Sequence, residues 1–380
     1  MDFRWSAAQS ALYESALAFA KSLDDTRTPS AAESGFSRAK WSRCGEFGLL
    51  GLCVPSELGG MGLDALTTSR LIEAFGRGTT DGGLLFAACA HLFACTMPIA
   101  EHGNAALKEA FLPKLARGEL IGANAITEAE AGSDVFALKT KAVRDGDHYV
   151  LNGVKSYVTN GAVADVFLVY AVTNPKHGFF GLSAFLVEKG TAGLTAGQPF
   201  PKVGLHNAPT GAVYFDNCRV PVSHRVGDEG QGAPAFQGSM SWERACLFAG
   251  YLGAMERDLD RVVAFANERQ QFGRPIGKNQ AISHRIANMK LRLESARLLL
   301  YRACSLKDAG EDATLDISLA KLAVSEAAVQ SGLDVIQIHG SLGVTSESGL
   351  ADSLLNALPC TIFSGTSEMQ RDLIARNLGL

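Results

Sequence analysis

The sequence predicts an α+β protein in which helical N-terminal and C-terminal regions flank an antiparallel β domain. Apolar residues recur at helical spacing near both ends of the chain, whereas short β-branched and aromatic runs gather in the middle. The chain has 380 residues, 47% of them hydrophobic and 19% charged, so it can bury a large core. We therefore expect an N-terminal helical domain at residues 1–118, a middle β domain at 119–228 and a C-terminal helical bundle at 229–380.

The N-terminal region is expected to be helical. A first apolar stripe at helical spacing consists of Leu12, Ala16, Phe19 and Leu23. Pro29 and Ser30 end that segment, and helical patterns resume near Leu71 and over residues 105–115. No uninterrupted apolar run is expected to be long enough to cross a bilayer, and the first residues carry no secretory signal.

The middle region is expected to form short strands. Residues 166–170 and 183–187 are compact β-rich runs, and residues 213–215 form a third. Asn152-Gly153 reads as a hairpin turn between two further runs. Regularly spaced short strands predict a sandwich or a barrel.

The C-terminal region is expected to contain two long helices, the second over residues 315–338. One face of the first helix is marked by Ile282, Ile286, Met289, Leu293 and Leu300. Lys290, Arg292 and Glu294 lie off that face. Arg292 and Arg297 could form a partner patch, but a solvated helix face is the usual explanation and the one we favour.

Charge and cysteine usage narrow the functional classes. The net charge of −4 gives no basic field for nucleic acid or an anionic membrane. None of the eight cysteines forms a C-x-x-C pair, which favours reduced core thiols in a cytoplasm. The eight histidines show neither H-E-x-x-H nor a triad context, so no metal site is expected.

Four motifs together carry a family resemblance. They are AITEAEAGSD at residues 125–134, NERQQFGRPIG at 267–277, QIHGSLG at 337–343 and GTS at 365–367. Each would be weak alone, but their order and spacing resemble those of the acyl-CoA dehydrogenases over nearly the whole chain. The resemblance implies a homotetramer that holds FAD between the β domain and the C-terminal helices.

The resemblance also implies where the cofactor is held. Ile126 and Thr127 would lie against the flavin edge, and Ser133 near the pyrophosphate. Contacts to the flavin ring would come from Tyr157, Val158 and Thr159. Contacts to the FAD of a neighbouring subunit would come from Arg269, Gln271, Gln337 and Gly340. Further cofactor contacts would come from Phe272, Gln280, Ser341, Thr366 and Glu368. Short side chains, hydroxyl and cationic donors and an apolar wall are the groups that such a cofactor needs.

The position of the catalytic carboxylate decides the mechanism. Dehydrogenation beside a thioester needs a base in a dry pocket, where desolvation raises the pKa of a carboxylate. In many family members the acid directly precedes the Gly-Thr of the C-terminal loop, where this chain has Ser364. The Ser364 hydroxyl cannot act as a strong base unaided, but its backbone N–H could donate to the thioester oxygen.

A second position supplies the base in other members, isovaleryl-CoA dehydrogenase among them, just before an arginine. Glu243-Arg244 matches that arrangement, so we expect Glu243 to be the base. The competing structural roles are an ion pair with Arg244 and a charge at a helix terminus. The ion pair is disfavoured because helical neighbours do not face each other. Arg244 and Trp242 are expected near the substrate, with core packing the usual role for Trp242.

A closer resemblance narrows the substrate. The runs that carry it include residues 163–167, 173–179, 183–191, 289–294, 301–304, 329–334 and 362–366. They resemble the prolyl-carrier-protein dehydrogenases, which oxidise L-proline held as a thioester on a phosphopantetheine arm, ultimately to pyrrole-2-carboxyl in antibiotic pathways. The resemblance implies a peptidyl carrier protein as partner.

Three alternatives stay open at this point. The first is an acyl-CoA dehydrogenase for a short or branched chain that uses the same base. The second is a reductase or oxidase on the same scaffold. The third, motivated by Ser364, is a flavin-binding paralogue without catalysis. The electron acceptor, an electron-transfer flavoprotein or oxygen, is also left undecided.

Overall fold

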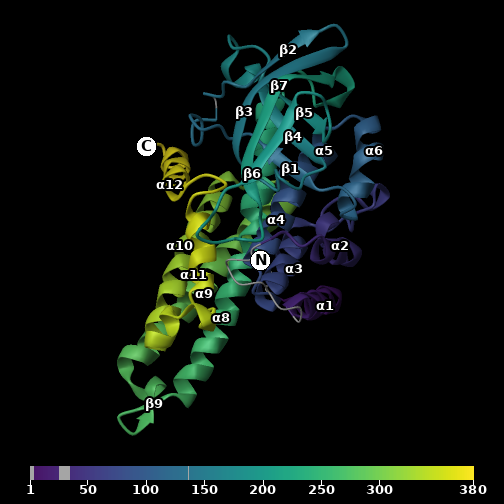
Figure 1. Ribbon diagram of the computed structural model, residues 1–380. Coiled ribbons are helices and arrows are strands. Elements are labelled where there is room, and N and C mark those ends of the chain that lie inside the picture. The colour runs from purple at the N-terminus through teal and green to yellow at the C-terminus, as the bar shows by residue number, and fades with distance from the viewer. Residues whose placement is uncertain (1–3, 25–34, 136) are drawn as a thin grey trace.

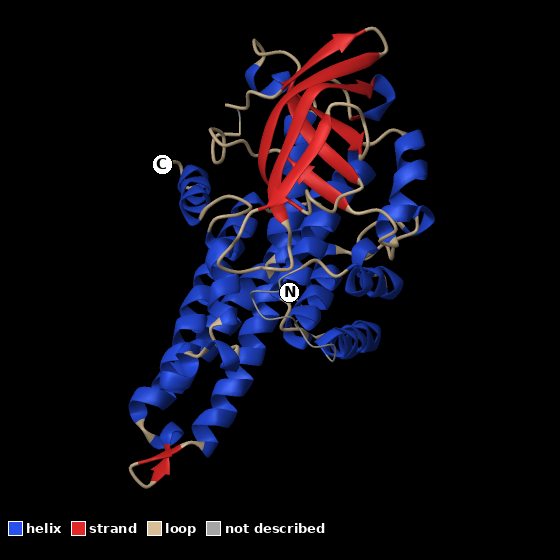
Figure 2. Ribbon diagram, viewed as in Figure 1, coloured by secondary structure: helices blue, strands red, loops and turns tan. Residues whose placement is uncertain are grey.

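The computed structural model describes residues 4–24, 35–135 and 137–380. Helices occupy both ends of the chain, and a curled sheet lies between them in sequence. In Figures 1 and 2 the sheet lies above the long helices, and several shorter helices lie beside it. The order of helices, strands and helices is the predicted α+β arrangement. It places the sheet against one end of the long C-terminal helices.

The N-terminal region is helical, as predicted. Its helices are α1 (Ala7–Asp24), α2 (Arg38–Phe47), α3 (Ala65–Gly78), α4 (Gly82–Cys89), α5 (Met97–His102) and α6 (Ala105–Ala116). Side-chain oxygens of Asp64, Asp81 and Asn104 cap α3, α4 and α6 by accepting backbone N–H groups. In α1, Ala16 and Leu23 of the predicted stripe are buried. Pro29 and Ser30 lie outside the described residues.

One continuous helical run was not predicted. The π-helical segment η4 (Ala90–Thr96) joins α4 to α5, giving a helix from Gly82 to His102. By length and composition this run could cross a membrane. The expectation that no such run exists is therefore wrong. However, 83% of its most apolar window is buried inside the fold, as for a core helix.

The middle region forms one eight-stranded sheet. Its strands are β1 (Gly122–Ala125), β2 (Lys141–Asp145), β3 (His148–Thr159), β4 (Val166–Val172), β5 (Leu182–Glu188), β6 (Leu194–Pro199), β7 (Thr210–Pro221) and β8 (Arg225–Val226). The order is β6-β7-β3-β2-β4-β5-β8, with β1 beside β4. Pairing is antiparallel except where β1 and β2 meet β4.

The sheet is buried on both faces of its central strands. On β4, Phe167 and Val169 enter a small core enclosed by the curled sheet, whereas Leu168 and Tyr170 join the large core shared with the helices. Alternating residues of a strand face opposite sides, so double burial explains the unbroken apolar run. The sheet curls on itself and does not divide into the two layers of a sandwich (Figure 2).

The predicted hairpin turn at Asn152-Gly153 is wrong. Strand β3 runs straight through both residues, and its pairing with β7 shifts by one register there. The Asn152 side chain accepts a hydrogen bond from the backbone N–H of Asn217 at 2.8 Å, which connects the two strands at the bulge. The actual turn is at Gly146, whose φ of 62° suits the two-residue loop between β2 and β3.

The C-terminal region is a helical bundle, as predicted. Its helices are α7 (Gly232–Trp242), α8 (Ala249–Glu268), α9 (Gln280–Asp308), α10 (Thr314–His339), α11 (Asp352–Ala357) and α12 (Ser367–Asn377). The π-helical turn η7 (Glu243–Leu247) connects α7 to α8. Two short strands, β9 (Gln270–Gln271) and β10 (Arg274–Pro275), form the far tip. Met289, Leu293 and Leu300 on α9 are buried, as expected.

The preferred interpretation of Arg292 and Arg297 as a solvated face is wrong. The Arg297 side chain is only 12% exposed and bonds Glu73 of α3 and Glu256 of α8. Arg292 pairs with the buried Asp334 of α10. Both arginines therefore connect α9 to neighbouring helices. Arg297, four residues after Leu293 and three before Leu300, lies on the buried face that those two residues mark.

The cysteines are core thiols, as predicted. All eight lie among the described residues, and each is buried and free. Burial raises the pKa of Cys44, Cys95 and Cys360 to about 12, so these thiols stay protonated at neutral pH. Among the described residues, no group of three potential metal ligands was found.

Candidate active site

A cavity of about 760 Å³ lies where the sheet meets the helices. Its lining comes from the helix Gly82–His102, the segment after β1, strand β3, helices α7 and α10, and the loop before α12. This volume is within the range of small-molecule and cofactor sites. The wall combines apolar side chains such as Phe236 and Met240 with hydroxyl and charged groups.

Glu243 is a buried carboxylate in this cavity. It lines the cavity and opens the π-helical turn η7, where the helix widens. Its residue is only 7% exposed. The hydroxyl of Ser364, 121 residues further along the chain, donates a hydrogen bond to Glu243 Oε1. The two candidate positions for the acid therefore meet in space.

The surroundings of Glu243 suit a base. Burial raises the pKa of Glu243 above its ordinary value because the charged form loses solvation. The Ser364 hydrogen bond and the charges of Arg244 and Lys321 oppose that shift without cancelling it. The carboxyl group is thus a better proton acceptor than a solvated glutamate.

The loop that contains Ser364 has an unusual backbone conformation. Ser364 and Gly365 have φ values of 56° and 89°, two consecutive left-handed residues. A Cβ added to Gly365 would lie 2.8 Å from Gln370 Nε2 and 3.0 Å from Arg244 Nη2. Arg244 Nε donates to the Ser364 carbonyl at 2.7 Å. Glu243 and Arg244 therefore both hold Ser364, one through its hydroxyl and the other through its backbone.

The sheet supplies the opposite wall. Ile126 and Thr127 follow β1 and line the cavity. The buried ammonium of Lys155 donates to the Ile126 carbonyl at 2.9 Å and to Glu128 Oε1 at 2.8 Å. The N–H of Ser156 donates to the Thr127 carbonyl at 2.8 Å. Strand β3 thus fixes the position of the Ile126–Thr127 segment.

A bulge in β3 directs two further predicted residues. The β3–β7 register shifts between Lys155 and Val158, and Tyr157 there has a φ of 57°. Tyr157 and Thr159 line the cavity, as does Ser133 after β1. Val158 between them points into the sheet core and is 1% exposed. Its side chain is therefore placed away from the cavity.

Three other predicted residues lie near the cavity but outside its lining. Trp242 donates from Nε1 to Glu101 Oε1 at 2.6 Å, and the Lys307 ammonium lies 4.3 Å from its ring centre. Thr366 is the N-cap of α12 and accepts from Met369 N–H. The Glu368 side chain, 79% exposed, lies in the first turn of that helix.

A last group of predicted residues lies around β9, which Figure 1 shows at the far end of the bundle, and at the C-terminal end of α10, where His339 stacks on Phe265 of α8. It comprises Arg269, Gln271, Phe272, Gln280, Gln337, Gly340 and Ser341. Thr314 at the start of α10 lines the cavity, whereas Gln337 is near the other end, roughly 35 Å away at 1.5 Å per residue. Phe272 is 95% exposed. Within the described residues, the cavity lining includes none of this group.

Several lining residues escaped the sequence prediction. Phe86, Ala90 and Ala94 come from the unpredicted helix, and Lys307 and Arg376 come from the ends of α9 and α12. Spacing of four residues in Phe86-Ala90-Ala94 was a usable signal, because it marks one helical face with room beside the alanines. The unbroken apolar stretch around it hid that face.

Comparison with known proteins agrees with this architecture. The acyl-CoA dehydrogenase models match in chain order: the N-terminal domain at residues 6–119, the middle domain at 123–218 and the C-terminal domain at 230–379. The fold and its central cavity thus define an acyl-CoA dehydrogenase-type protein. The chain belongs to the acyl-CoA dehydrogenase family.

The similar individual proteins include two that share one name and a related solved structure. An L-prolyl-[peptidyl-carrier protein] dehydrogenase of Pseudomonas fluorescens is 54% identical over 91% of both chains. One of the same name from a Serratia species is 46% identical over 100% of this chain and 99% of its own. A solved structure described as PigA with FAD and proline has a TM-score of 0.97 and 46% identity, with both chains fully covered.

Proposed function

We propose that this protein is an FAD-dependent dehydrogenase of a thioester-bound substrate, namely L-proline on a peptidyl carrier protein. The observation that carries the proposal is the buried Glu243 carboxylate, held by Ser364 inside the large cavity. Its residue type, burial and raised pKa are what α-proton removal needs. The P. fluorescens and Serratia relatives support the choice of substrate.

The cavity fits FAD by the chemistry of its lining. Hydroxyl groups of Thr127, Ser133 and Thr159 and the guanidinium of Arg376 offer donors, and apolar residues form a wall for a flat ring. Thr127, Tyr157 and Thr159 would hold the ring portion. A bound flavin supplies a two-electron acceptor beside the substrate. A structural neighbour described as an FAD complex of PigA, 47% identical, supports this assignment.

Within that arrangement Glu243 takes the proton from the carbon next to the thioester carbonyl. The carboxylate needs no large movement, since Ser364 fixes one of its oxygens. The backbone N–H of Ser364 is our candidate donor to the thioester oxygen, where negative charge develops. Lys155 acts only indirectly, by positioning the Ile126–Thr127 segment.

The proposal is tested by intact-mass analysis of a prolyl-loaded carrier protein after incubation with the enzyme. Loss of about two or four hydrogens would report one or two two-electron oxidations of the bound group. Glu243→Gln is expected to slow this oxidation ~10²–10⁴-fold while bound FAD is retained. Unchanged oxidation by that variant would overturn the assignment of the base.

A second candidate is an acyl-CoA dehydrogenase for a short or branched chain. A 36% identical relative is a short-chain acyl-CoA dehydrogenase of Clostridium acetobutylicum, and a 37% identical one is the mitochondrial isovaleryl-CoA dehydrogenase of Arabidopsis thaliana. Side-by-side assays with CoA and carrier-protein thioesters separate the two. Turnover of CoA esters alone would favour this candidate.

The remaining alternatives are addressed by the flavin itself. Anaerobic bleaching by a saturated thioester would argue against a reductase, and no bleaching by any thioester would favour a paralogue without catalysis. Transfer of electrons to an electron-transfer flavoprotein or to oxygen is decided by supplying each in turn. We further propose a homotetramer in the cytoplasm; the free, buried cysteines are compatible with a reducing compartment.

A further inference from the structure

Two helices form a groove that leads away from Glu243. One wall is the helix Gly82–His102 and the other is α7–η7–α8. Along the first wall, Ala94, Ala90 and Phe86 line the large cavity in turn. Along the second, Met240, Glu243 and Arg244 do the same. Ala94, Ala90 and Phe86 are four residues apart, and Glu243 and Arg244 follow Met240 by three and four residues. Each set therefore lies along one side of its helix, so the groove has a definite direction.

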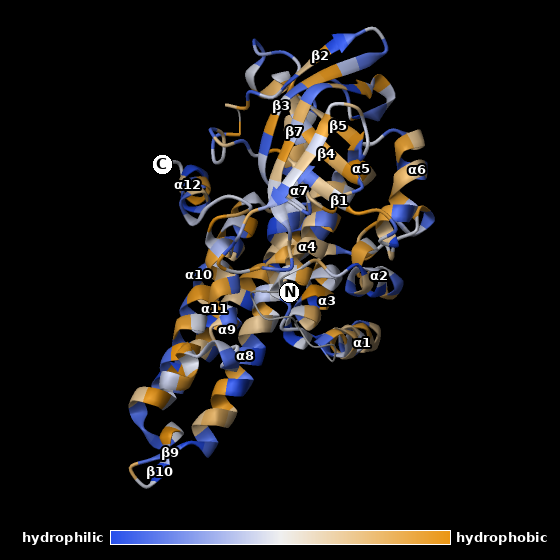
Figure 3. Ribbon diagram, in the orientation of Figure 1, coloured by the Kyte–Doolittle hydropathy of each residue, from blue (hydrophilic) through white to orange (hydrophobic). Residues whose placement is uncertain are grey.

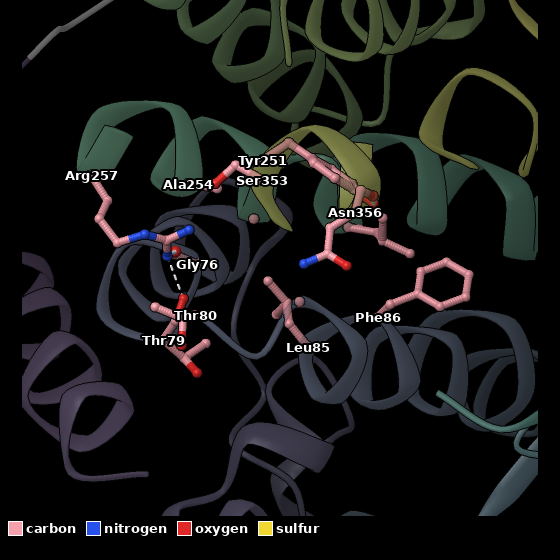
Figure 4. Close-up of a pocket in the computed structure, with 13 residues that line it drawn as sticks. Gly76, Thr79, Thr80, Leu85, Phe86, Tyr251, Ala254, Arg257, Ser353 and Asn356 are labelled. Atoms are coloured by element: carbon pink, nitrogen blue, oxygen red, sulfur yellow. Dashed lines mark hydrogen bonds between the residues drawn. The ribbon is translucent and has the colours of Figure 1, made fainter. Parts of the chain in front are cut away.

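The same groove continues into a second, smaller cavity. Its walls include the next turns of the same helices, with Gly82, Leu85 and Phe86 from one and Leu247, Gly250 and Tyr251 from the other. Residues at the end of α3 and on α11 complete the lining. The empty interior is about 40 Å³, enough for a few atoms. Figure 4 shows Phe86 at one end of this cavity and Arg257 at the other.

Phe86 separates the two cavities. It is the one residue shared by both linings in the described part of the chain. Its ring lies 4.5 Å from that of Phe363, the neighbour of Ser364. The ring centre of Phe363 is in turn 5.5 Å from that of Phe248 and 6.4 Å from that of Tyr251. The partition is therefore a packed aromatic cluster.

Backbone packing limits how far the groove can widen. A Cβ on Gly76 would lie 2.1 Å from the Gly250 carbonyl, so α3 and α8 are in direct contact. A Cβ on Gly250 would lie 2.5 Å from Leu85. Space beyond the partition can thus grow only by shortening a side chain such as Phe86, because the helices themselves cannot approach or separate easily.

We propose that Phe86 is a specificity-determining residue that closes the acyl end of the substrate site and restricts it to compact acyl groups. This inference rests on the proposed function, since it places the acyl group beside Glu243. A compact ring such as that of proline ends before the partition. A longer linear chain would have to displace the Phe86 ring from its contact with Phe363.

The test measures binding, so it does not depend on turnover. Redox-inert S-butyl, S-hexyl and S-octyl thioethers of pantetheine are titrated by calorimetry into the FAD-loaded wild type and Phe86→Ala. We expect the octyl-to-butyl affinity ratio to rise at least about tenfold in the variant, as for added methylene contacts in an apolar pocket. Phe86→Leu should give a smaller rise and serves if Phe86→Ala does not fold.

The matched control is Phe93→Ala. Phe93 is on the same helix and is fully buried, but it lines neither cavity. Three results would overturn the proposed role of Phe86. They are an equal rise of the octyl-to-butyl ratio in the control, an unchanged ratio in both Phe86 variants, and no thioether binding to any of the proteins. Failure of the wild type to oxidise prolyl-carrier protein would instead reject the proposed function, and the two failures are read in separate assays.

Discussion

At the scale of single residues, the Ser364 hydroxyl matters through the group that it touches. Ser364 occupies one of the two positions at which the family resemblance predicts an acid, and in this chain it donates to Glu243. That hydrogen bond favours the charged carboxylate and lowers the pKa of Glu243, against the larger effect of burial. We therefore propose that Ser364 positions Glu243 for its proposed role as the base.

Ser364→Ala should change the pH dependence of the reaction. Loss of the donor lets burial raise the pKa of Glu243 further, so the fraction of ionised base falls at a given pH. The acidic limb of the kcat/KM profile should move to higher pH, with most activity retained on the alkaline side. Ser239→Ala is the control, because that hydroxyl bonds its own helix at Phe236 O and should leave the limb in place. A limb that stays unmoved in Ser364→Ala would contradict this role.

Only part of the candidate site could be predicted from the sequence. Glu243 was predicted because Glu-Arg at the start of the third region is visible in the sequence. The contact between Glu243 and Ser364 was not, because the two residues are 121 positions apart and meet only through the fold. Phe86 was missed for a similar reason. Its spacing from Ala90 and Ala94 marks one helical face, but only the fold places a second cavity next to it.

At the scale of elements, ionic contacts join the helices of the bundle. Arg297 of α9 reaches Glu73 of α3, Glu256 of α8 and Glu294 one turn away. Glu73 is fully buried, and burial raises its pKa despite the nearby Arg297. Removal of the arginine would leave a buried carboxylate with fewer partners.

Arg297→Met should destabilise the protein by roughly 3–5 kcal/mol, the usual consequence of removing one partner of a buried ion pair. The loss should be larger at pH 8 than at pH 5. The folded pKa of Glu73 is already raised, so its burial opposes folding mainly above that pKa, and the arginine offsets this effect there. Denaturant unfolding at both pH values measures the change.

Arg302→Met is the matched control for this experiment. Arg302 is on the same helix, but its side chain is 56% exposed and pairs with Asp316 at 3.0 Å. An exposed pair of this kind contributes about 0–1 kcal/mol. Equal losses in the two variants would show that Arg297 acts as an ordinary surface residue.

The sequence predicted elements correctly where one face of the element is buried. It failed where contacts with other elements determine the local structure. The α9 stripe was visible because Met289, Leu293 and Leu300 repeat on one face. Asn152-Gly153 has turn chemistry, yet β7 supplies partners on both sides and absorbs the two residues as a bulge. The solvated-face interpretation of Arg297 failed because its carboxylate partners lie on other helices.

At the scale of the whole molecule, the predicted cofactor residues divide into two distant groups. Thr127, Tyr157 and Thr159 line the cavity, whereas Arg269 and Gln337 lie at the far end of long helices. A single chain cannot bring both groups to one cofactor in this conformation. If the far group binds FAD, the FAD belongs to another copy, as the family resemblance implies.

Mixing two inactive variants tests whether the far group of residues binds the FAD of a neighbouring copy. Arg269→Ala should lose bound FAD, and Glu243→Gln should bind FAD without turning over. In mixed oligomers an Arg269→Ala subunit keeps its Glu243 and can use the intact Arg269 of a Glu243→Gln neighbour. Activity after mixing should therefore exceed the sum of the separate variants.

The control for the mixing experiment is Arg274→Ala, at the same tip of the bundle, where Arg274 bonds Asn279 Oδ1 at 2.7 Å. This variant should retain FAD. Absence of any recovery in the mixture of Arg269→Ala and Glu243→Gln would mean that Arg269 does not serve a neighbouring copy.

The hydrogen bond between Glu243 and Ser364 has an evolutionary consequence. A helix and a distant loop deliver side chains to the same point, so an ancestral enzyme could hold its acid on either one. Transfer of the acid from one backbone to the other would then require two substitutions and little rearrangement of the active centre. Two lineages with differently located acids could in this way retain one stereochemistry of proton abstraction.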